Sequence, residues 1–142
     1  MAKKKLIIEY TFDFDLFGIV ASEKEYKLAW SINQKFGINL KKQQDILLEL
    51  VGNKKLTISN YIFETENSSF RFFKNKSMDV EDGDPLYLLP EVKNFDFLIM
   101  IEDEGDSLQQ EQVPEKLSQI PIIQYYQKFD LNKLKSKENL LF

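Results

Sequence analysis

The chain has 142 residues, of which 43% are hydrophobic and 12 are Phe, so it is long and apolar enough to form one folded core. It contains no Cys and no His, which excludes disulfides, thiol nucleophiles, Ser-His-Asp hydrolases and zinc hydrolases. The net charge of −4 argues against a broad nucleic-acid-binding surface, because such surfaces are basic.

The N-terminal part of the chain predicts a strand followed by a helix. Apolar and polar side chains alternate through residues 6–16, which indicates a long half-buried strand that ends in a turn near Gly18. Ser22 and Glu25 have the spacing of a capping box, an apolar stripe follows, and Gly37 stands where many helices end. We therefore expect a helix over residues 22–36 that lies on the sheet.

Tyr26 and Trp30 stand four residues apart at the edge of that apolar stripe. Side chains with this spacing lie on one face of a helix. Two interpretations stay open here: the rings widen the contact with the core, or they form a partner surface, because Trp and Tyr are enriched in protein interfaces.

The middle of the chain predicts a hairpin and an acidic loop. Residues 56–64 and 70–76 have the pattern of strands joined by a polar turn, with a bulge near Asn60, whereas residues 45–51 fit either a strand or a helical turn. Arg71 among several Phe would suit a platform for single-stranded nucleic acid if the rings were exposed. The acidic residues of 77–85 do not follow the ligand spacing of a calcium loop, so we expect a solvated loop.

The most apolar strand spans residues 95–101 and is expected in the middle of a sheet, because both of its faces are largely apolar. Pro114 predicts a short helix through Leu117 that cannot continue past Pro121, and residues 122–129 form the last expected strand. The expected fold is α+β: a single domain over 1–142 with a two-layer, mainly antiparallel sheet, one long and one short helix on one face, and a ferredoxin-like or similar arrangement. The tail from about residue 131 is expected at the periphery of this domain.

A short motif overlaps the start of that strand: Leu89-Pro90-Glu91, three residues, then Phe95-Asp96-Phe97. It resembles the signature of the bacterial IPExxxVDY family, and short similarities elsewhere extend the resemblance over most of the chain. The first, fourth and last of these six residues replace Ile, Val and Tyr, so the phenol of the signature is absent. The resemblance implies no activity, cofactor or catalytic residue. We expect Pro90 to fix the loop and the two acidic residues to accept hydrogen bonds from backbone N–H groups, with a direct binding role as the alternative.

We expect a protein without catalytic, cofactor-binding or metal-binding residues that acts by binding another protein. The expected partner surface comprises Tyr26, Trp30, Leu140, Leu141 and Phe142. One alternative is an RNA-associated accessory protein. Scattered lysines suggest it, and so does the resemblance, because genes of that family often lie near those for ribonuclease III and pyruvate kinase. The other is an enzyme that uses carboxylates such as Asp13, Asp15 and Asp96. The sequence contains no recognisable membrane or targeting segment, so we expect a cytoplasmic protein, and its oligomeric state stays open.

Overall fold

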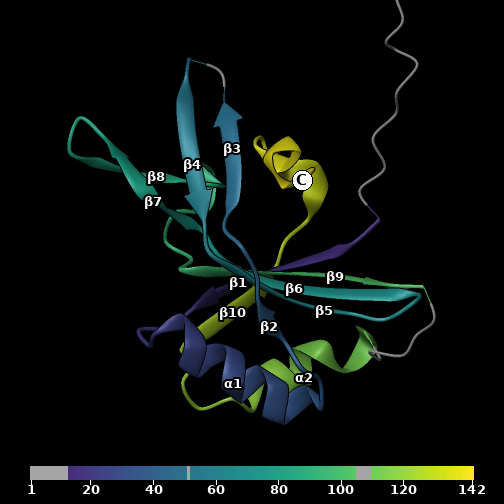
Figure 1. Ribbon diagram of the computed structural model, residues 1–142. Helices are drawn as coiled ribbons and strands as arrows, with labels where there is room; N and C mark the ends of the chain where they lie inside the picture. The colour runs from purple at the N-terminus through teal and green to yellow at the C-terminus, as the bar shows by residue number, and fades with distance from the viewer. Residues whose placement is uncertain (1–12, 51, 105–109) are drawn as a thin grey trace, which may run out of the picture.

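The computed structural model describes residues 13–50, 52–104 and 110–142, and its main element is a six-stranded antiparallel sheet (Figure 1). Its strands are β1 Asp15–Val20, β2 Lys41–Lys42, β5 Asn60–Glu64, β6 Ser68–Lys74, β9 Phe97–Asp103 and β10 Tyr125–Lys128. Their order across the sheet is β10-β1-β9-β6-β5-β2. Strand β9 lies between β1 and β6 and pairs with both, which confirms the prediction that the most apolar segment is central.

Two helices connect strands that run in the same direction. Helix α1, Glu25–Phe36, lies between β1 and β6 in the chain, and these strands are parallel because β9 is antiparallel to both. Helix α2, Val113–Ser118, connects β9 to β10 in the same way, with β1 between them. The resulting fold is α+β as expected, and the order β10-β1-β9-β6 corresponds to two interlocked β-α-β units. No helix in the described part of the chain is long and apolar enough to cross a membrane.

Both helices lie on one face of the sheet, below it in Figure 1, and enclose the first of two cores. Leu28, Ala29 and Ile32 form the buried face of α1, as the apolar stripe predicted. They belong to one buried cluster with Phe72 and Ile99 of the sheet. Full burial of a large apolar side chain contributes about 1.5–3 kcal/mol, so this layer is a main source of stability.

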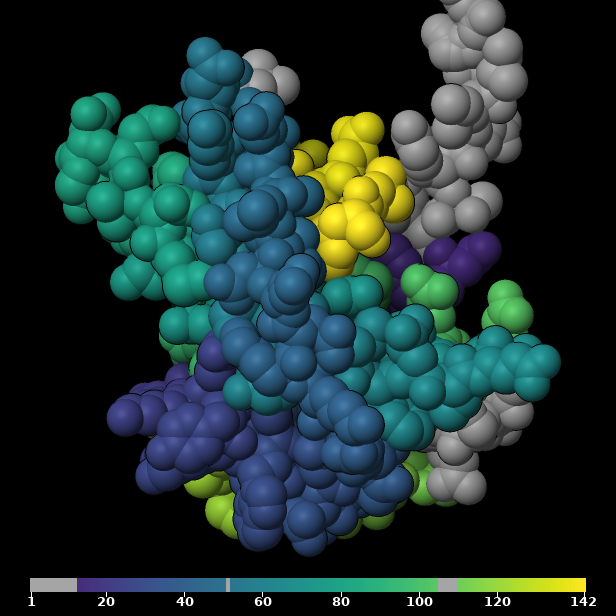
Figure 2. Space-filling model, in the orientation of Figure 1, coloured from purple at the N-terminus to yellow at the C-terminus, as the bar shows by residue number. Residues whose placement is uncertain are grey.

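The opposite face of the sheet is covered by two hairpins and the C-terminal segment. One hairpin pairs β3, Ile46–Leu50, with β4, Lys54–Ile58, and the other pairs β7, Lys76–Glu81, with β8, Asp84–Tyr87. Leu134 and Leu140 of the C-terminal segment are buried in a second core with residues of β3 and β4. In Figure 2 this segment (yellow) lies beside the β3–β4 hairpin (blue), so it folds back onto the body of the protein.

Strand β1 differs from the expected first strand. Residues 6–12 of that expected strand lie outside the described residues, and β1 begins only at Asp15. It continues through Gly18 to Val20, so the expected turn at Gly18 is wrong. The glycine has a packing role instead, because a Cβ at this position would stand 2.5 Å from the ring of Phe129 and 2.7 Å from the ring of Phe95.

The ends of helix α1 agree with the sequence only in part. The expected capping box is wrong, because α1 begins at Glu25 with Lys24 in the capping position, and the Lys24 side chain makes no capping hydrogen bond. Gly37 ends the helix as expected, with φ of 67° and its N–H donating to the Asn33 carbonyl.

Two further expectations for the middle of the chain need correction. The expected strand 56–64 is divided at Ser59, where the chain leaves the β3–β4 hairpin and enters the main sheet, and this explains the shift in apolar phase near Asn60. The expected loop over 77–85 is the β7–β8 hairpin, with Asp82 and Gly83 in its turn at φ of 53° and 83°. Asp-Gly favours this two-residue turn, a signal that the acidic composition of the segment obscured.

Candidate functional site

The motif segment forms a turn whose backbone is held by the side chain of Asn75. Leu89 is buried, and a 3-10 turn, Pro90–Val92, begins at Pro90. The fully buried Asn75 amide accepts a hydrogen bond from Leu89 N–H at 2.8 Å. It donates to the carbonyl oxygens of Val92 at 3.0 Å and Phe95 at 3.2 Å. One side chain therefore satisfies backbone groups at both ends of the turn, as buried polar groups require.

The two acidic residues of the motif connect this turn to distant parts of the fold. Asp96 Oδ2 accepts a hydrogen bond from Ala21 N–H at 3.0 Å, in the loop before α1. Glu91 Oε2 accepts one from Ser136 N–H at 2.7 Å, in the C-terminal segment. Burial would raise the pKa of Glu91, but hydrogen bonds, chiefly from Ser136, outweigh this effect and lower the pKa below its usual value. Asp96 thus accepts a backbone hydrogen bond from the loop before α1, and Glu91 accepts one from the C-terminal segment.

The two motif aromatics, Phe95 and Phe97, lie in different cores. Phe95 meets Phe129 edge-on in the second core, with ring centroids 5.0 Å apart. Phe97 stacks on Phe72 in the first core, with ring centroids 5.2 Å apart. Both are buried, so they hold the two layers to the sheet rather than face solvent.

Tyr26 and Trp30 lie on the outer face of α1, where they are 56% and 63% exposed. Leu28 and Ala29, between them in the chain, are buried against the sheet. The surface is hollowed on both sides of Trp30, with cavity volumes of about 500 and 360 Å³. Ile122 lines the larger hollow, and residues 119–121, which follow α2, line the smaller one. We call this region, centred on Tyr26 and Trp30, the aromatic surface of α1.

The other three residues of the expected partner surface lie in the C-terminal segment. Leu140 is buried in the second core, whereas Leu141 and Phe142 are 41% and 40% exposed. The ring of Phe142 meets that of Phe73 edge-on at 5.8 Å and lies 5.3 Å from the Arg71 guanidinium. Helix α1 and the C-terminal segment are on opposite faces of the sheet (Figure 1), so the five expected residues form two separate regions.

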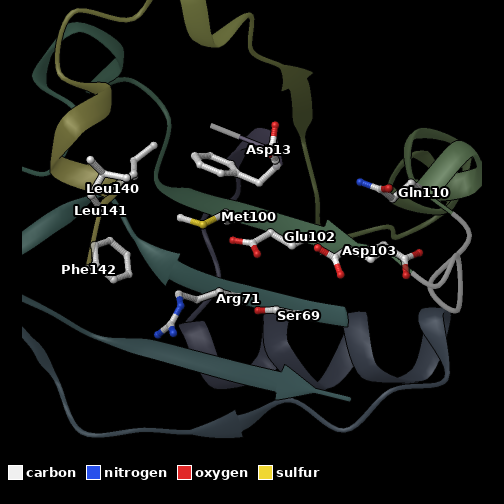
Figure 3. Close-up of a pocket in the computed structure, with 12 residues that line it drawn as sticks. Asp13, Ser69, Arg71, Met100, Glu102, Asp103, Gln110, Leu140, Leu141 and Phe142 are labelled. Atoms are coloured by element: carbon white, nitrogen blue, oxygen red, sulfur yellow. The ribbon is translucent and has the colours of Figure 1, made fainter. Parts of the chain in front are cut away.

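A groove of about 590 Å³ lies between the C-terminal residues and the sheet (Figure 3). Arg71 of β6 and Glu102 of β9 line its centre, with Phe142 at one end and Gln110 at the other. Arg71 Nη1 donates to Asn60 Oδ1 at 2.9 Å. Burial lowers the pKa of Arg71, while the carboxylates of Glu64 and Glu102 act in the opposite direction. Among the described residues of this wall Arg71 is the one cation, and it is already in contact with protein groups.

The carboxylates that were candidates for catalysis do not converge. Asp13 borders the groove, whereas Asp15 accepts a hydrogen bond from Gln110 at 3.1 Å and pairs with Lys128 at 3.4 Å. Asp96 lies near the other end of β1, beside Ala21. Within residues 13–50, 52–104 and 110–142, no group of three or more acidic side chains is arranged to hold a metal ion.

A platform for nucleic-acid bases requires exposed rings on β6, and the positions of its Phe side chains do not meet this condition. Phe70, Phe72 and Phe73 of β6 are all buried. The first two lie in the first core and Phe73 lies in the second, so all three rings are covered. Bases stack only on rings that solvent can reach.

The fold and these surfaces define a small α+β protein with an exposed aromatic helix face and an internally braced motif. Comparisons with protein-family models, with curated proteins and with solved structures found no match to this chain.

Proposed function

We propose that this chain is a non-enzymatic module that binds another protein through the aromatic surface of α1. The observation that carries the proposal is the exposure of Trp30 and Tyr26 on a helix whose other face is buried. Trp and Tyr supply much of the binding energy at protein interfaces, because they bury a large apolar area at a small cost in side-chain entropy. A partner that covers both rings would remove this area from water.

The shape of the aromatic surface favours an extended segment of the partner. Trp30 stands between the two hollows, and both hollows have Ser31 in their lining. Alternate side chains of an extended chain point to one face about 7 Å apart, so two apolar side chains can enter the two hollows while the backbone crosses the Trp30 ring. Glu23 and Lys27, which pair at 3.6 Å, stand at the rim of the larger hollow and can orient the segment.

The C-terminal residues support this role less well than α1 does. Leu140 is buried, so docking through it would require the tail to leave the second core. Deleting residues 140–142 would expose that core and disturb the fold and a partner surface together. The aromatic surface of α1 therefore gives the cleaner test.

We also propose that the chain belongs to the IPExxxVDY family, on the motif at residues 89–97. The contacts of Glu91 and Asp96 with distant backbone groups would then be a structural feature that its members share. The proposal assigns these residues no direct part in partner binding.

The test is affinity purification of the tagged protein from its own cells, followed by titration of the recovered partner against purified variants. Trp30→Ala is expected to weaken binding at least tenfold, which corresponds to about 1.4 kcal/mol. Leu47→Ala is the matched control, because Leu47 is 75% exposed on β3, away from α1. Its binding should equal that of the wild type.

Both variants should unfold at the wild-type urea concentration, because exposed side chains contribute little to stability. Undiminished binding by Trp30→Ala would refute the proposed surface. A partner lost equally from Leu47→Ala would indicate non-specific capture and would also count against it.

A further inference from the structure

Three lysines line one hollow at the end of the sheet where β6 finishes and β9 begins. Lys74 ends β6, Lys76 begins β7, and Lys93 follows the turn of the motif segment. All three line a cavity of about 340 Å³. Its remaining lining residues are Ala21, Ser22, Glu23, Tyr87, Asp96 and Phe97.

The backbone beneath these lysines is fixed by Asn75. Lys74 and Lys76 are its two neighbours in the chain, and its own N–H donates to the Asp96 carbonyl at 3.1 Å. Its side chain donates to the carbonyls of Val92 and Phe95, which flank the Lys93 segment. Asn75 therefore fixes the backbone next to all three lysines, although they belong to different elements.

The charges around the hollow are unequal. The five salt bridges found among the described residues involve Lys27, Lys42, Lys54 and Lys128, and none of them involves the three lysines of the hollow. Two carboxylates also line the hollow. Asp96 accepts a hydrogen bond from the Ala21 N–H, and Glu23 forms an ion pair at 3.6 Å with Lys27, a residue outside the lining. The three lysines outnumber the two carboxylates, so the lining keeps an excess of positive charge that a bound anion would offset.

We propose that this hollow binds a phosphate group carried by a small molecule. Lysine binds phosphate as a point charge, and three such charges suit a group that carries about two negative charges. The hydroxyl of Ser22 and the phenol of Tyr87 stand in the same lining and can donate hydrogen bonds to phosphate oxygens. Helix α1 begins just after this loop, so its positive end adds to the field.

The arrangement favours a small ligand over a nucleic-acid strand. A strand is held along a track of basic groups with exposed rings on which the bases stack. Here the three lysines line one hollow, and of the two rings in that lining Phe97 is buried and Tyr87 is half-buried. The hollow shares Glu23 with the rim of the aromatic surface of α1, but its three lysines lie outside that surface, so phosphate binding does not depend on a partner there.

Titration of the isotopically labelled protein with inorganic pyrophosphate, followed by two-dimensional NMR at constant ionic strength, tests the proposal. Saturable shifts are expected at the amides of Ser22, Lys74, Lys76 and Lys93, and not at Trp30. The triple variant Lys74→Gln, Lys76→Gln, Lys93→Gln should bind at least tenfold more weakly.

The matched control is Lys41→Gln, Lys54→Gln, Lys55→Gln, which removes the same charge from exposed lysines elsewhere. It should bind pyrophosphate as the wild type does. If both triple variants bound pyrophosphate equally weakly, or if the chemical shifts did not saturate, binding would reflect only the overall charge of the protein, and the proposal would be overturned. A short oligouridylate that binds through the same lysines more tightly than pyrophosphate would overturn the assignment to a small molecule.

Discussion

Replacing Asn75 with Asp should destabilise the protein strongly, although the two side chains have the same shape. The change converts Nδ2 from a donor into an oxygen acceptor. Three carbonyl oxygens face this atom, those of Val92 at 3.0 Å, Phe95 at 3.2 Å and Leu89 at 3.4 Å. Three hydrogen bonds thus become three contacts between oxygens at a position with no solvent exposure.

The magnitude follows from these contacts. A typical hydrogen bond contributes about 1 kcal/mol net, and a buried group left without its partner costs about 1–3 kcal/mol. We therefore expect a loss of about 3–5 kcal/mol from a free energy of unfolding that is about 5–15 kcal/mol in most domains. Burial raises the folded-state pKa of the new carboxyl above its unfolded value, so the loss should be smaller at about pH 4 and grow as the pH rises.

Urea unfolding followed by far-UV circular dichroism measures this difference. Asn94→Asp is the matched control, because it makes the same chemical change at an exposed residue of the same turn. The control should stay within about 0.5 kcal/mol of the wild type. If the two variants were equally stable, or if the loss at Asn75 did not diminish at low pH, the reasoning about the buried amide would be refuted.

Two further predictions concern the same end of the sheet. Gly18→Ala should lower the free energy of unfolding by about 1–3 kcal/mol, because the new Cβ would overlap the rings of Phe129 and Phe95. An unchanged urea midpoint would show that the rings move aside without cost. The Ser136 amide should titrate in NMR with a midpoint below the ordinary Glu value of 4.5, because Glu91 accepts its hydrogen bond, and Glu91→Gln should abolish that titration. Since the folded pKa of Glu91 is lowered, its contribution to stability is present above the unfolded pKa and is lost as the pH falls through the folded one. A midpoint at or above 4.5 would contradict this assignment.

Local patterns in the sequence were sufficient for the elements that depend on neighbouring residues. Apolar residues on both faces of 95–101 require cover on both sides, and this made β9 central. The apolar stripe of α1 and the residue that ends it, Gly37, depend on spacing within a few residues. The absence of Cys and His excluded whole classes of chemistry without reference to the fold.

Other features arise only when segments distant in the sequence meet. A glycine such as Gly18 locally favours a turn. It lies within a strand instead, and two rings from later in the chain fill the space that a side chain at this position would need. Asn75 has no pattern that separates it from a surface Asn, since its partners lie 14 to 20 residues further along the chain. The five expected partner residues were divided between two faces for the same reason.

The sequence by itself determined which segments are apolar, where the helix ends and which reactive groups are missing, because these properties are carried by single residues and short spacings. The tertiary structure decided which polar groups are buried, which rings face solvent and which charges share a hollow. Those properties depend on strand order and register, and strand order and register are set by contacts between residues far apart in the chain.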